Sequence, residues 1–185
     1  KELQGIANRT DFDLKQHMKH SGQDLSLFDE ESKKKIVPHV IAEPSQGVDR
    51  AFLVFMFDAY DFDKKRGNVV LKLHPKLAPI KVGVFPLVSN KPQVVKKAKE
   101  VYNELKSEWN CIIDFSGSVG RRYSRQDESG TPLCCTLDFQ SLKDDTATLG
   151  DRDTTNQIRV KIKDIISVIS RFMNGEKFNS LGKKV

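Results

Sequence analysis

Residues 80–115, IKVGVFPLVSNKPQVVKKAKEVYNELKSEWNCIIDF, switch twice between the hydrophobic periods of strands and helices. Apolar residues alternate over Ile80–Leu87, which predicts a β-strand. From Pro92 to Trp109 the apolar side chains recur at helical spacing and form one continuous stripe. Cys111–Phe115 is short and apolar, as expected of a buried strand. This order of elements is typical of an α/β layer.

The next residues continue the pattern. The arginine stretch that follows the Gly/Ser turn is expected to form a helix that Gly130 and Pro132 stop. Two strands are predicted at 133–139 and 147–149, joined by the polar loop QSLKDD. The helix and the first of these strands repeat the alternation seen upstream.

A last helix is predicted from Thr154 to Met173, with Gly175 as its stop. The full order is then β-α-β-α-β-β-α. Because helices must cover both faces of such a sheet, residues 79–185 are expected to form an α/β domain with a mixed β-sheet flanked by helices.

Residues 1–78 have a different pattern. Strands are predicted at 3–7 and 37–43, an apolar helix at 49–60, and a connector at 63–79. Two or three elements of this kind cannot close a hydrophobic core. They therefore need a larger sheet that lies outside this chain. We therefore expect these residues to be part of a separate domain.

Composition sets wide limits on function. The 185 residues carry a net charge of +6, which permits contact with phosphate but does not require it. The three cysteines are odd in number and lack CxxC spacing, so a reduced, cytoplasmic protein is expected. No apolar run is long enough to span a membrane. The first residue is Lys1, which suggests a piece of a longer protein.

Two motifs near the N-terminus have residues suited to a nucleotide. In EPSQGVDR, residues 43–50, Arg50 begins a helix and suits a triphosphate, while Glu43 could hold an ammonium group. In ELQGIANR, Glu2 could bind Mg²⁺. The alternatives are a capped turn with a surface arginine, and an ordinary exposed acid. The sequence contains no cluster with the ligand spacing of a metal site.

The stretch SGSVGRRYSRQDESGTP, residues 116–132, concentrates charge next to a Gly/Ser turn. Arg121 and Arg125 share a helix face that could receive a phosphate backbone. Asp127 and Glu128 could accept hydrogen bonds from amino groups of unpaired bases. The alternative is a solvated helix face with intrahelical ion pairs. Use of the SGSVG turn as a nucleotide cradle is less favoured, because GxGxxG and Walker spacing are absent.

These segments resemble a known family. GSVGRRYSRQDESGTP, TLDF and TATLGDRDT resemble the anticodon-binding domain of class IIa aminoacyl-tRNA synthetases. ELQGIANRTDFDL, HSGQDL, PHVIAEPSQGVDRAF and VVLKLHPKLAPIKVGVFPL resemble the glycyl branch of that class. The resemblance implies an anticodon-binding domain at 79–185, preceded at 1–78 by a remnant of the class II antiparallel-sheet catalytic domain. One departure is Gly150, which stands where the family often has arginine before DRD.

The resemblance also implies roles for individual residues. Arg50 is expected to be catalytic through its contact with ATP, and Glu43 and Ser45 to line the glycine pocket. Glu2 and Arg9 are expected to border the ATP site. The candidates for anticodon binding are Arg121, Arg122, Arg125, Asp127, Glu128 and Arg152.

The complete enzyme implied by this resemblance attaches glycine to tRNA-Gly. It would use ATP and Mg²⁺ and act as a homodimer, with neither membrane nor DNA as partner. The first two class II motifs are missing from this chain, so the chain alone is expected to be inactive and to hold no cofactor tightly. Two interpretations remain open: the C-terminal part of such an enzyme, or a free-standing, non-catalytic tRNA- or RNA-binding module derived from one.

Overall fold

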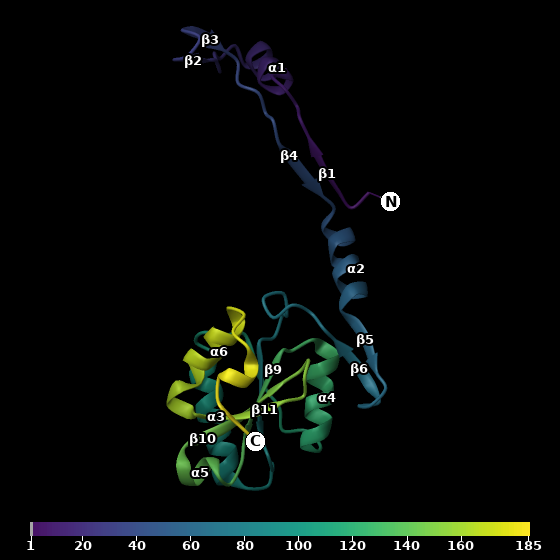
Figure 1. Ribbon diagram of the computed structural model, residues 1–185, viewed down its shortest axis with the longest axis vertical. Helices are drawn as coiled ribbons and strands as arrows, with labels where there is room; N and C mark the ends of the chain where they lie inside the picture. The colour runs from purple at the N-terminus through teal and green to yellow at the C-terminus, as the bar shows by residue number, and fades with distance from the viewer. Residues whose placement is uncertain (1) are drawn as a thin grey trace. The chain divides into compact units, whose positions relative to one another are not determined.

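The computed structural model describes residues 2–185, which divide after Val54 into two compact units (Figure 1). We call residues 2–54 the N-terminal unit and Phe55–Val185 the C-terminal unit. Helix α2, Val48–Ala59, contains the division. The division reflects contacts within this chain, and the assignment of residues 1–78 and 79–185 to two domains of a larger enzyme stays a prediction.

The C-terminal unit contains a six-stranded mixed sheet in the order β12-β11-β10-β9-β7-β8. The three parallel strands are β7 (Val82–Pro86), β8 (Cys111–Ile113) and β9 (Leu133–Leu137). The antiparallel strands are β10 (Thr146–Asp151), β11 (Gln157–Lys161) and β12 (Lys183–Lys184). The predicted α/β class with a mixed sheet is confirmed.

Helices cover both faces of this sheet. Figure 1 shows α3 and α6 on one side of the strands and α4 on the other. The helical segments are α3 (Pro92–Leu105), α4 (Val119–Ser129), α5 (Ser141–Asp144) and α6 (Ile165–Met173), with 3₁₀ turns at Ile162–Asp164 and Phe178–Ser180. The main hydrophobic core lies between the sheet and the α3–α6 side, where fully buried residues such as Val84, Val101, Leu149 and Ile169 meet.

Helix α4 ends at the predicted glycine, and a serine that was not predicted as a cap fixes its start. The Ser118 hydroxyl accepts a hydrogen bond from the Arg121 amide. At the other end Gly130 has φ 78°, and the Thr131 amide donates to the Gln126 carbonyl at 2.9 Å. This 6→1 bond with a left-handed glycine is a Schellman motif. The helix therefore has both ends fixed by local sequence.

The predicted last helix is wrong over its first half. Residues 157–161 form strand β11, and α6 begins only at Ile165. Ile158 and Val160 are buried on the core side of the sheet, as period-two alternation requires. The apolar residues at 158, 162 and 165 also fit helical spacing, so the two periods compete over this stretch.

A β-hairpin that was not predicted lies where the predicted helix 49–60 meets the predicted connector 63–79. Strands β5 (Tyr60–Asp63) and β6 (Asn68–Leu71) pair antiparallel, and β6 packs against α4. Val70 is fully buried there. Docking on α4 gives this segment a structure that its own short apolar pattern does not specify.

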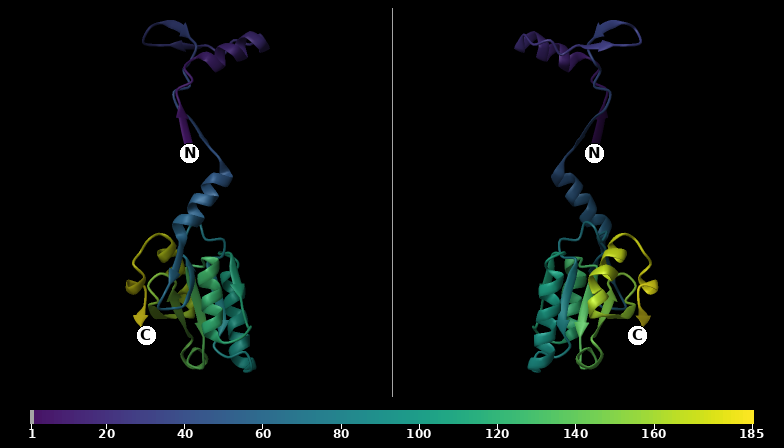
Figure 2. Two further views of the ribbon diagram at one scale, coloured as in Figure 1. Left: turned by 90° about the vertical axis from the view of Figure 1, so that its right-hand side faces the viewer. Right: turned by 90° about the vertical axis from the view of Figure 1, so that its left-hand side faces the viewer.

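The N-terminal unit consists of two small antiparallel pairs, helix α1 and the first part of α2. Its elements are β1 (Gln4–Ala7), α1 (Phe12–Ser21), β2 (Leu27–Asp29), β3 (Lys34–Ile36) and β4 (Glu43–Gln46). Figure 2 shows β1 and β4 running side by side. The strand predicted at 37–43 is displaced, because β4 begins at Glu43. No residue from 2 to 54 is buried, in agreement with the prediction that these elements do not close a core.

No helix within residues 2–185 is both long enough and apolar enough to cross a membrane.

Candidate nucleic-acid interface

One surface of the sheet in the C-terminal unit is polar. Side chains alternate between the two faces of a strand, so each of β9, β10 and β11 has one apolar and one polar side. Pairing places Thr136 opposite Thr148, and Thr148 opposite Arg159. Gly150 lies in the next row of the same face, between Cys134 and Gln157. We call this surface the polar face: Cys134, Thr136, Thr148, Gly150, Gln157 and Arg159.

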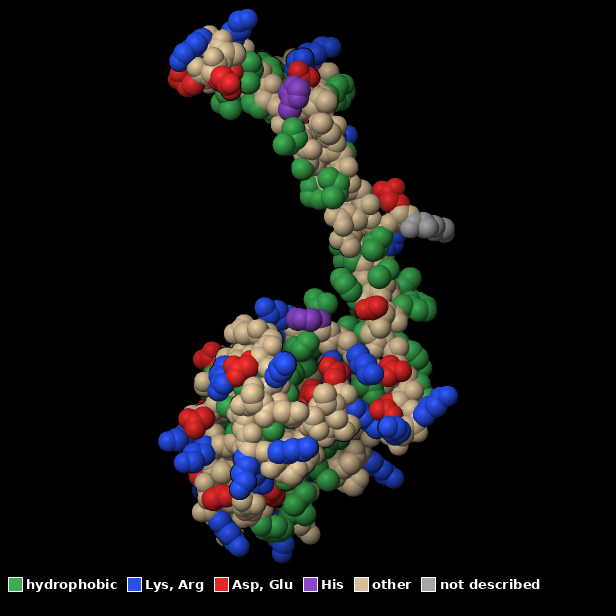
Figure 3. Space-filling model, viewed as in Figure 1, with side chains coloured by type: hydrophobic (Ala, Val, Ile, Leu, Met, Phe, Trp, Pro, Cys, Tyr) green, Lys and Arg blue, Asp and Glu red, His purple; other side chains and the backbone are tan. Residues whose placement is uncertain are grey.

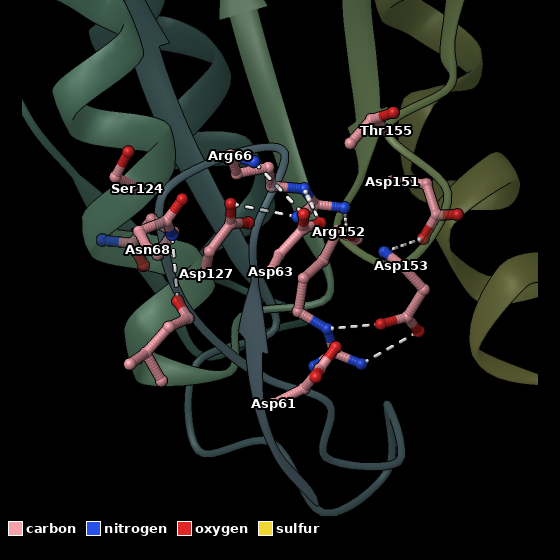
Figure 4. Close-up of polar contacts among 12 residues, drawn as sticks. Asp61, Asp63, Arg66, Asn68, Ser124, Asp127, Asp151, Arg152, Asp153 and Thr155 are labelled. Atoms are coloured by element: carbon pink, nitrogen blue, oxygen red, sulfur yellow. Dashed lines mark hydrogen bonds and ion pairs between the residues drawn. The ribbon is translucent and has the colours of Figure 1, made fainter.

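A pocket of about 220 Å³ opens beside the polar face. Helix α4 supplies Ser124 and Asp127 to its wall, and the β5–β6 hairpin supplies Arg66 and Asn68 (Figure 4). Tyr123 of α4 also lines the pocket. The remaining lining residues come from the sheet and the β10–β11 turn: Cys134, Gly150, Asp151, Arg152, Thr155 and Gln157. The wall therefore offers hydrogen-bonding groups from four separate elements.

Tyr123 forms the aromatic side of this pocket. Its hydroxyl lies 2.9 Å from the Thr136 hydroxyl, and its ring meets Phe85 edge-on at 5.4 Å between centroids. Burial raises the pKa of Tyr123, so the hydroxyl stays neutral. A Cβ on Gly150 would lie 3.0 Å from Tyr123 Cε1. The absence of a side chain at Gly150 therefore lets the Tyr123 ring lie directly against strand β10.

The outer side of α4 carries three of the predicted anticodon residues. Arg121, Arg125 and Glu128 are exposed. The Arg125 guanidinium donates to Asp114 Oδ2 at 2.5 and 3.1 Å and to the Ser116 carbonyl at 2.7 Å. These contacts leave two cationic side chains and one carboxylate at the water-facing surface next to the pocket.

Arg122 points into the protein. Its side chain is among the largest that are fully enclosed, with only 2% of the residue exposed. The guanidinium donates to five oxygens, which belong to Pro86, Ser89, Phe115, Ser116 and Gly117. Burial lowers the pKa of Arg122, and the charge of Asp114 opposes that effect. No edge of this guanidinium is left for a ligand.

Asp127 and Arg152 also face inward. Asp127 accepts a hydrogen bond from Arg66 at 3.1 Å, and burial raises the Asp127 pKa while Arg66 lowers it. Arg152 donates to the carbonyls of Gly130 and Leu73 at 2.7 and 2.8 Å. The two predicted residues thus meet in one corner of the pocket wall, where they join protein elements together.

At the other end of the polar face, Arg159 and Asp138 form a bidentate pair at 2.6 and 2.8 Å. Arg159 also donates to the hydroxyls of Thr146 and Thr148. The hydrogen bonds from Arg159 lower the pKa of Asp138 to about 2. This pair fixes the loop after β9 against β10 and β11.

Sequence reasoning missed Arg66, Asn68, Gln157 and Arg159. The last two share a face with Thr148 only once residues 157–161 are recognised as a strand, and their alternation with Ile158 and Val160 was the available signal. Arg66 and Asn68 had no such signal, because only the docking of the β5–β6 hairpin on α4 brings them to the pocket.

In the N-terminal unit the predicted glycine residues, Glu43 and Ser45, lie on β4, which pairs with β1, and the predicted ATP residues Glu2 and Arg9 flank β1. Ala7 pairs with Glu43, and Gly5 with Ser45. The Arg50 guanidinium donates to the Glu2 carbonyl oxygen at 2.8 Å. Glu43 and Ser45 are both exposed.

Arg9 makes the strongest polar contacts of this unit. It donates to both Asp13 carboxylate oxygens at 2.8 and 2.7 Å and lies 3.2 Å from a Glu43 oxygen. The hydrogen bond to Asp13 raises the pKa of Arg9. Across the described part of the chain, residues 2–185, no three His, Cys, Asp or Glu side chains are arranged to hold a metal ion.

Comparison with known proteins points to one family. Residues 81–172 match the family described as anticodon binding domain. The glycine–tRNA ligase of Clostridium acetobutylicum is 48% identical over 167 residues, covering 89% of this chain and 35% of the relative. That of Caldanaerobacter subterraneus is 51% identical over 166 residues, with the same coverage. That of Corynebacterium efficiens is 46% identical over 181 residues, covering 94% and 39%. The chain thus spans little more than a third of the length of these curated relatives.

Proposed function

We propose, from the match of residues 81–172 to the anticodon binding domain family, that the chain is part of a glycine–tRNA ligase whose C-terminal unit binds the anticodon loop of tRNA-Gly. The alignment with the Clostridium acetobutylicum relative covers 89% of the 185 residues, about 165, whereas the family match covers 92, so the similarity extends about 73 residues beyond the matched domain. That extension favours a ligase over the alternative of a free-standing anticodon-binding module.

The pocket beside the polar face is the observation that carries the proposal. Proteins read unpaired RNA bases by hydrogen bonds to their edges and by stacking on aromatic rings. The pocket combines Tyr123 with the side chains of Ser124, Gln157 and Thr155. We assign it to one base that is turned out of the anticodon loop.

The exposed side of α4 supplies the contacts to the RNA backbone. Arg121 and Arg125 can bind phosphate oxygens through charge-assisted hydrogen bonds. Glu128 can accept a hydrogen bond from the amino group of a base. Arg122, Asp127 and Arg152 act from inside, where they hold the loops and the helix end that shape this surface.

Residues 1–78, which include the N-terminal unit, are assigned to the catalytic domain of the complete enzyme. There the glycine carboxylate attacks the α-phosphate of ATP and displaces pyrophosphate to give glycyl-adenylate. A terminal ribose hydroxyl of tRNA then attacks the glycyl carbonyl, forms the ester and releases AMP and a proton. Glu43 pairs with the glycine ammonium group, and Ser45 lies beside it. Arg50 and Arg9 contact ATP, with Arg50 the catalytic residue, and Glu2 provides an oxygen ligand for Mg²⁺.

Three further assignments come from the family resemblance. The complete enzyme acts as a homodimer, works in the cytoplasm, and has tRNA-Gly, ATP and glycine as its partners. The first and second class II motifs lie outside this chain, so the chain by itself is inactive in aminoacylation.

The test is binding of the chain to an anticodon stem-loop of tRNA-Gly and to the same stem-loop with a substituted anticodon, at two salt concentrations. We expect at least about tenfold preference for the native anticodon, since one mismatched base contact costs about 1–3 kcal/mol. Gly150→Val should abolish the preference, because its side chain meets Tyr123, whereas Gly120→Ala enters open space and should not. Equal and steeply salt-dependent binding of both stem-loops would contradict the proposal.

A further inference from the structure

The wall of the pocket contains residues from outside the matched anticodon binding domain. That domain covers residues 81–172, whereas Arg66 and Asn68 belong to the β5–β6 hairpin. Figure 4 shows Arg66 between the helix that carries Asp127 and the turn that carries Arg152. The pocket is therefore incomplete without a segment that precedes the domain.

Arg66 connects three elements through one guanidinium group. Nη1 donates to Asp127 Oδ2 of α4 at 3.1 Å, and Nη2 donates to the Arg152 carbonyl at 2.7 Å. Nε lies 3.0 Å from Asp63 Oδ2 within the hairpin itself. Only 16% of the Arg66 side chain and 11% of the Asp127 side chain are exposed, so water screens these ion pairs little.

A second set of contacts ties the same elements together. Arg152 donates to the carbonyl of Leu73, just beyond the hairpin, and to that of Gly130 at the end of α4. A Cβ on Gly130 would lie 3.1 Å from the Leu71 carbonyl oxygen, so the chain segments approach each other closely. The last turn of α4, the β10–β11 turn and the hairpin are thus joined at one corner.

We propose that the β5–β6 hairpin is part of the RNA-binding site and that Arg66 is its positioning residue. Arg66 holds Asp127 and the Arg152 backbone at fixed separation, which sets the distance between Ser124 on α4 and Thr155 in the turn, on opposite sides of the pocket mouth. This inference rests on the proposed function of the pocket. A planar guanidinium with several donors can bridge three partners at once, whereas a lysine ammonium group cannot match that geometry.

The experiment compares Arg66→Gln and Arg66→Lys with wild type in the complete chain. The first readout is the ratio of affinities for the native and substituted anticodon stem-loops. The second, measured without RNA, is hydrogen exchange of the hairpin amides. Lys72→Gln is the matched control, because it removes the exposed Lys72–Asp61 ion pair at 2.7 Å from the same hairpin.

We expect both Arg66 variants to lose at least about tenfold in the affinity ratio, to keep the salt dependence of non-specific binding, and to exchange hairpin amides faster. The control should match wild type in all three. An Arg66→Gln variant that keeps the wild-type ratio would overturn the positioning role. Wild-type protein without any preference would instead overturn the proposed function, and with it the RNA role of Arg66. In that case exchange rates unchanged by Arg66→Gln would also disprove its role in docking the hairpin.

Discussion

Arg121 and Arg122 are neighbours in sequence with opposite environments. Successive residues of a helix point about 100° apart, so one guanidinium reaches water while the other enters the protein and meets five oxygens. Arg122 joins the loops after β7 and β8 to the start of α4. Its main effect is therefore expected on stability, and that of Arg121 on RNA binding.

Substitution Arg122→Met should destabilise the C-terminal unit by about 3–5 kcal/mol, because it leaves the buried carbonyl oxygen of Pro86 and the partly buried ones of Phe115 and Gly117 without this donor. Arg121→Met should change stability by less than about 0.5 kcal/mol, since its side chain is exposed. Urea unfolding followed by circular dichroism measures both. Similar stability of the two variants would show that the buried hydrogen bonds of Arg122 contribute little.

The Asp138–Arg159 pair predicts a dependence of stability on pH. The folded protein lowers the pKa of Asp138 from 3.8 to about 2, with the hydrogen bonds from Arg159 as the main cause. Above about pH 4 the carboxylate is charged in both states and its stabilisation, about 2 kcal/mol, is complete. As pH falls from about 4 to 2 the unfolded chain binds the proton first, so this stabilisation is lost.

Urea midpoints at pH 5 and pH 3 test this, with Asp138→Asn as the comparison. The variant should be less stable at pH 5 and should lose less stability between the two values. An equal loss in wild type and variant would assign the acid sensitivity to other carboxylates.

At the scale of elements, α4 and α6 end in the same way but in different surroundings. Gly130 and Gly175 both have positive φ, 78° and 92°, and each ends a helix. A Cβ on Gly130 would meet Leu71 and Leu73, whereas a Cβ on Gly175 has nothing within 4 Å. The first glycine therefore serves both the helix end and the docking of the hairpin.

Gly175→Ala should cost about 1 kcal/mol for the left-handed backbone alone. Gly130→Ala should cost about 1–3 kcal/mol more, because its side chain also crowds the segment after β6. Thermal unfolding of both variants gives the difference, and it should vanish in a chain whose hairpin is already undocked by Arg66→Gln. Equal costs in the wild-type background would mean that the hairpin yields to the added methyl group.

Strand β11 shows the limit of periodicity. Ile158, Ile162 and Ile165 fit a helical stripe, while Ile158 and Val160 fit a strand, so the residues satisfy both patterns. The strand forms because Ile158 pairs with Leu149 and Val160 pairs with Ala147, which adds residues 157–161 to the sheet next to β10. Local sequence does not contain that partner.

At the scale of the molecule, the two units differ in what supports them. The C-terminal unit encloses a core of 20 buried apolar residues around its sheet, from Val82 to Leu181. The N-terminal unit encloses none, and Ile6, Leu27 and Ile41 are more than half exposed. Figure 3 shows hydrophobic side chains at the surface of this unit and of α2. Such an arrangement lacks the burial that normally offsets chain entropy.

Hydrogen exchange of the chain should therefore separate the units. Amides of β1, β4 and α1 are expected to exchange at nearly unprotected rates, whereas those of β7, β9 and β10 should require unfolding of the C-terminal unit. Mass spectrometry of peptides from the exchanged chain gives both rates. Strong protection in residues 4–46 would mean that these residues acquire a core, for example by association of chains.

The sequence by itself determined the α/β class, the glycine stop of α4 and the resemblance to a family, because hydrophobic period, glycine stops and long characteristic segments are local properties of the chain. The anticodon, glycine and ATP roles assigned to single residues remain predictions. Tertiary structure alone decided which α4 residues face water. The buried side of this helix carries Arg122, Gln126 and Asp127, so no apolar stripe indicates it. Those polar groups can be buried only because the loops of the sheet and the β5–β6 hairpin supply their hydrogen-bond partners, and such partners come together only on folding.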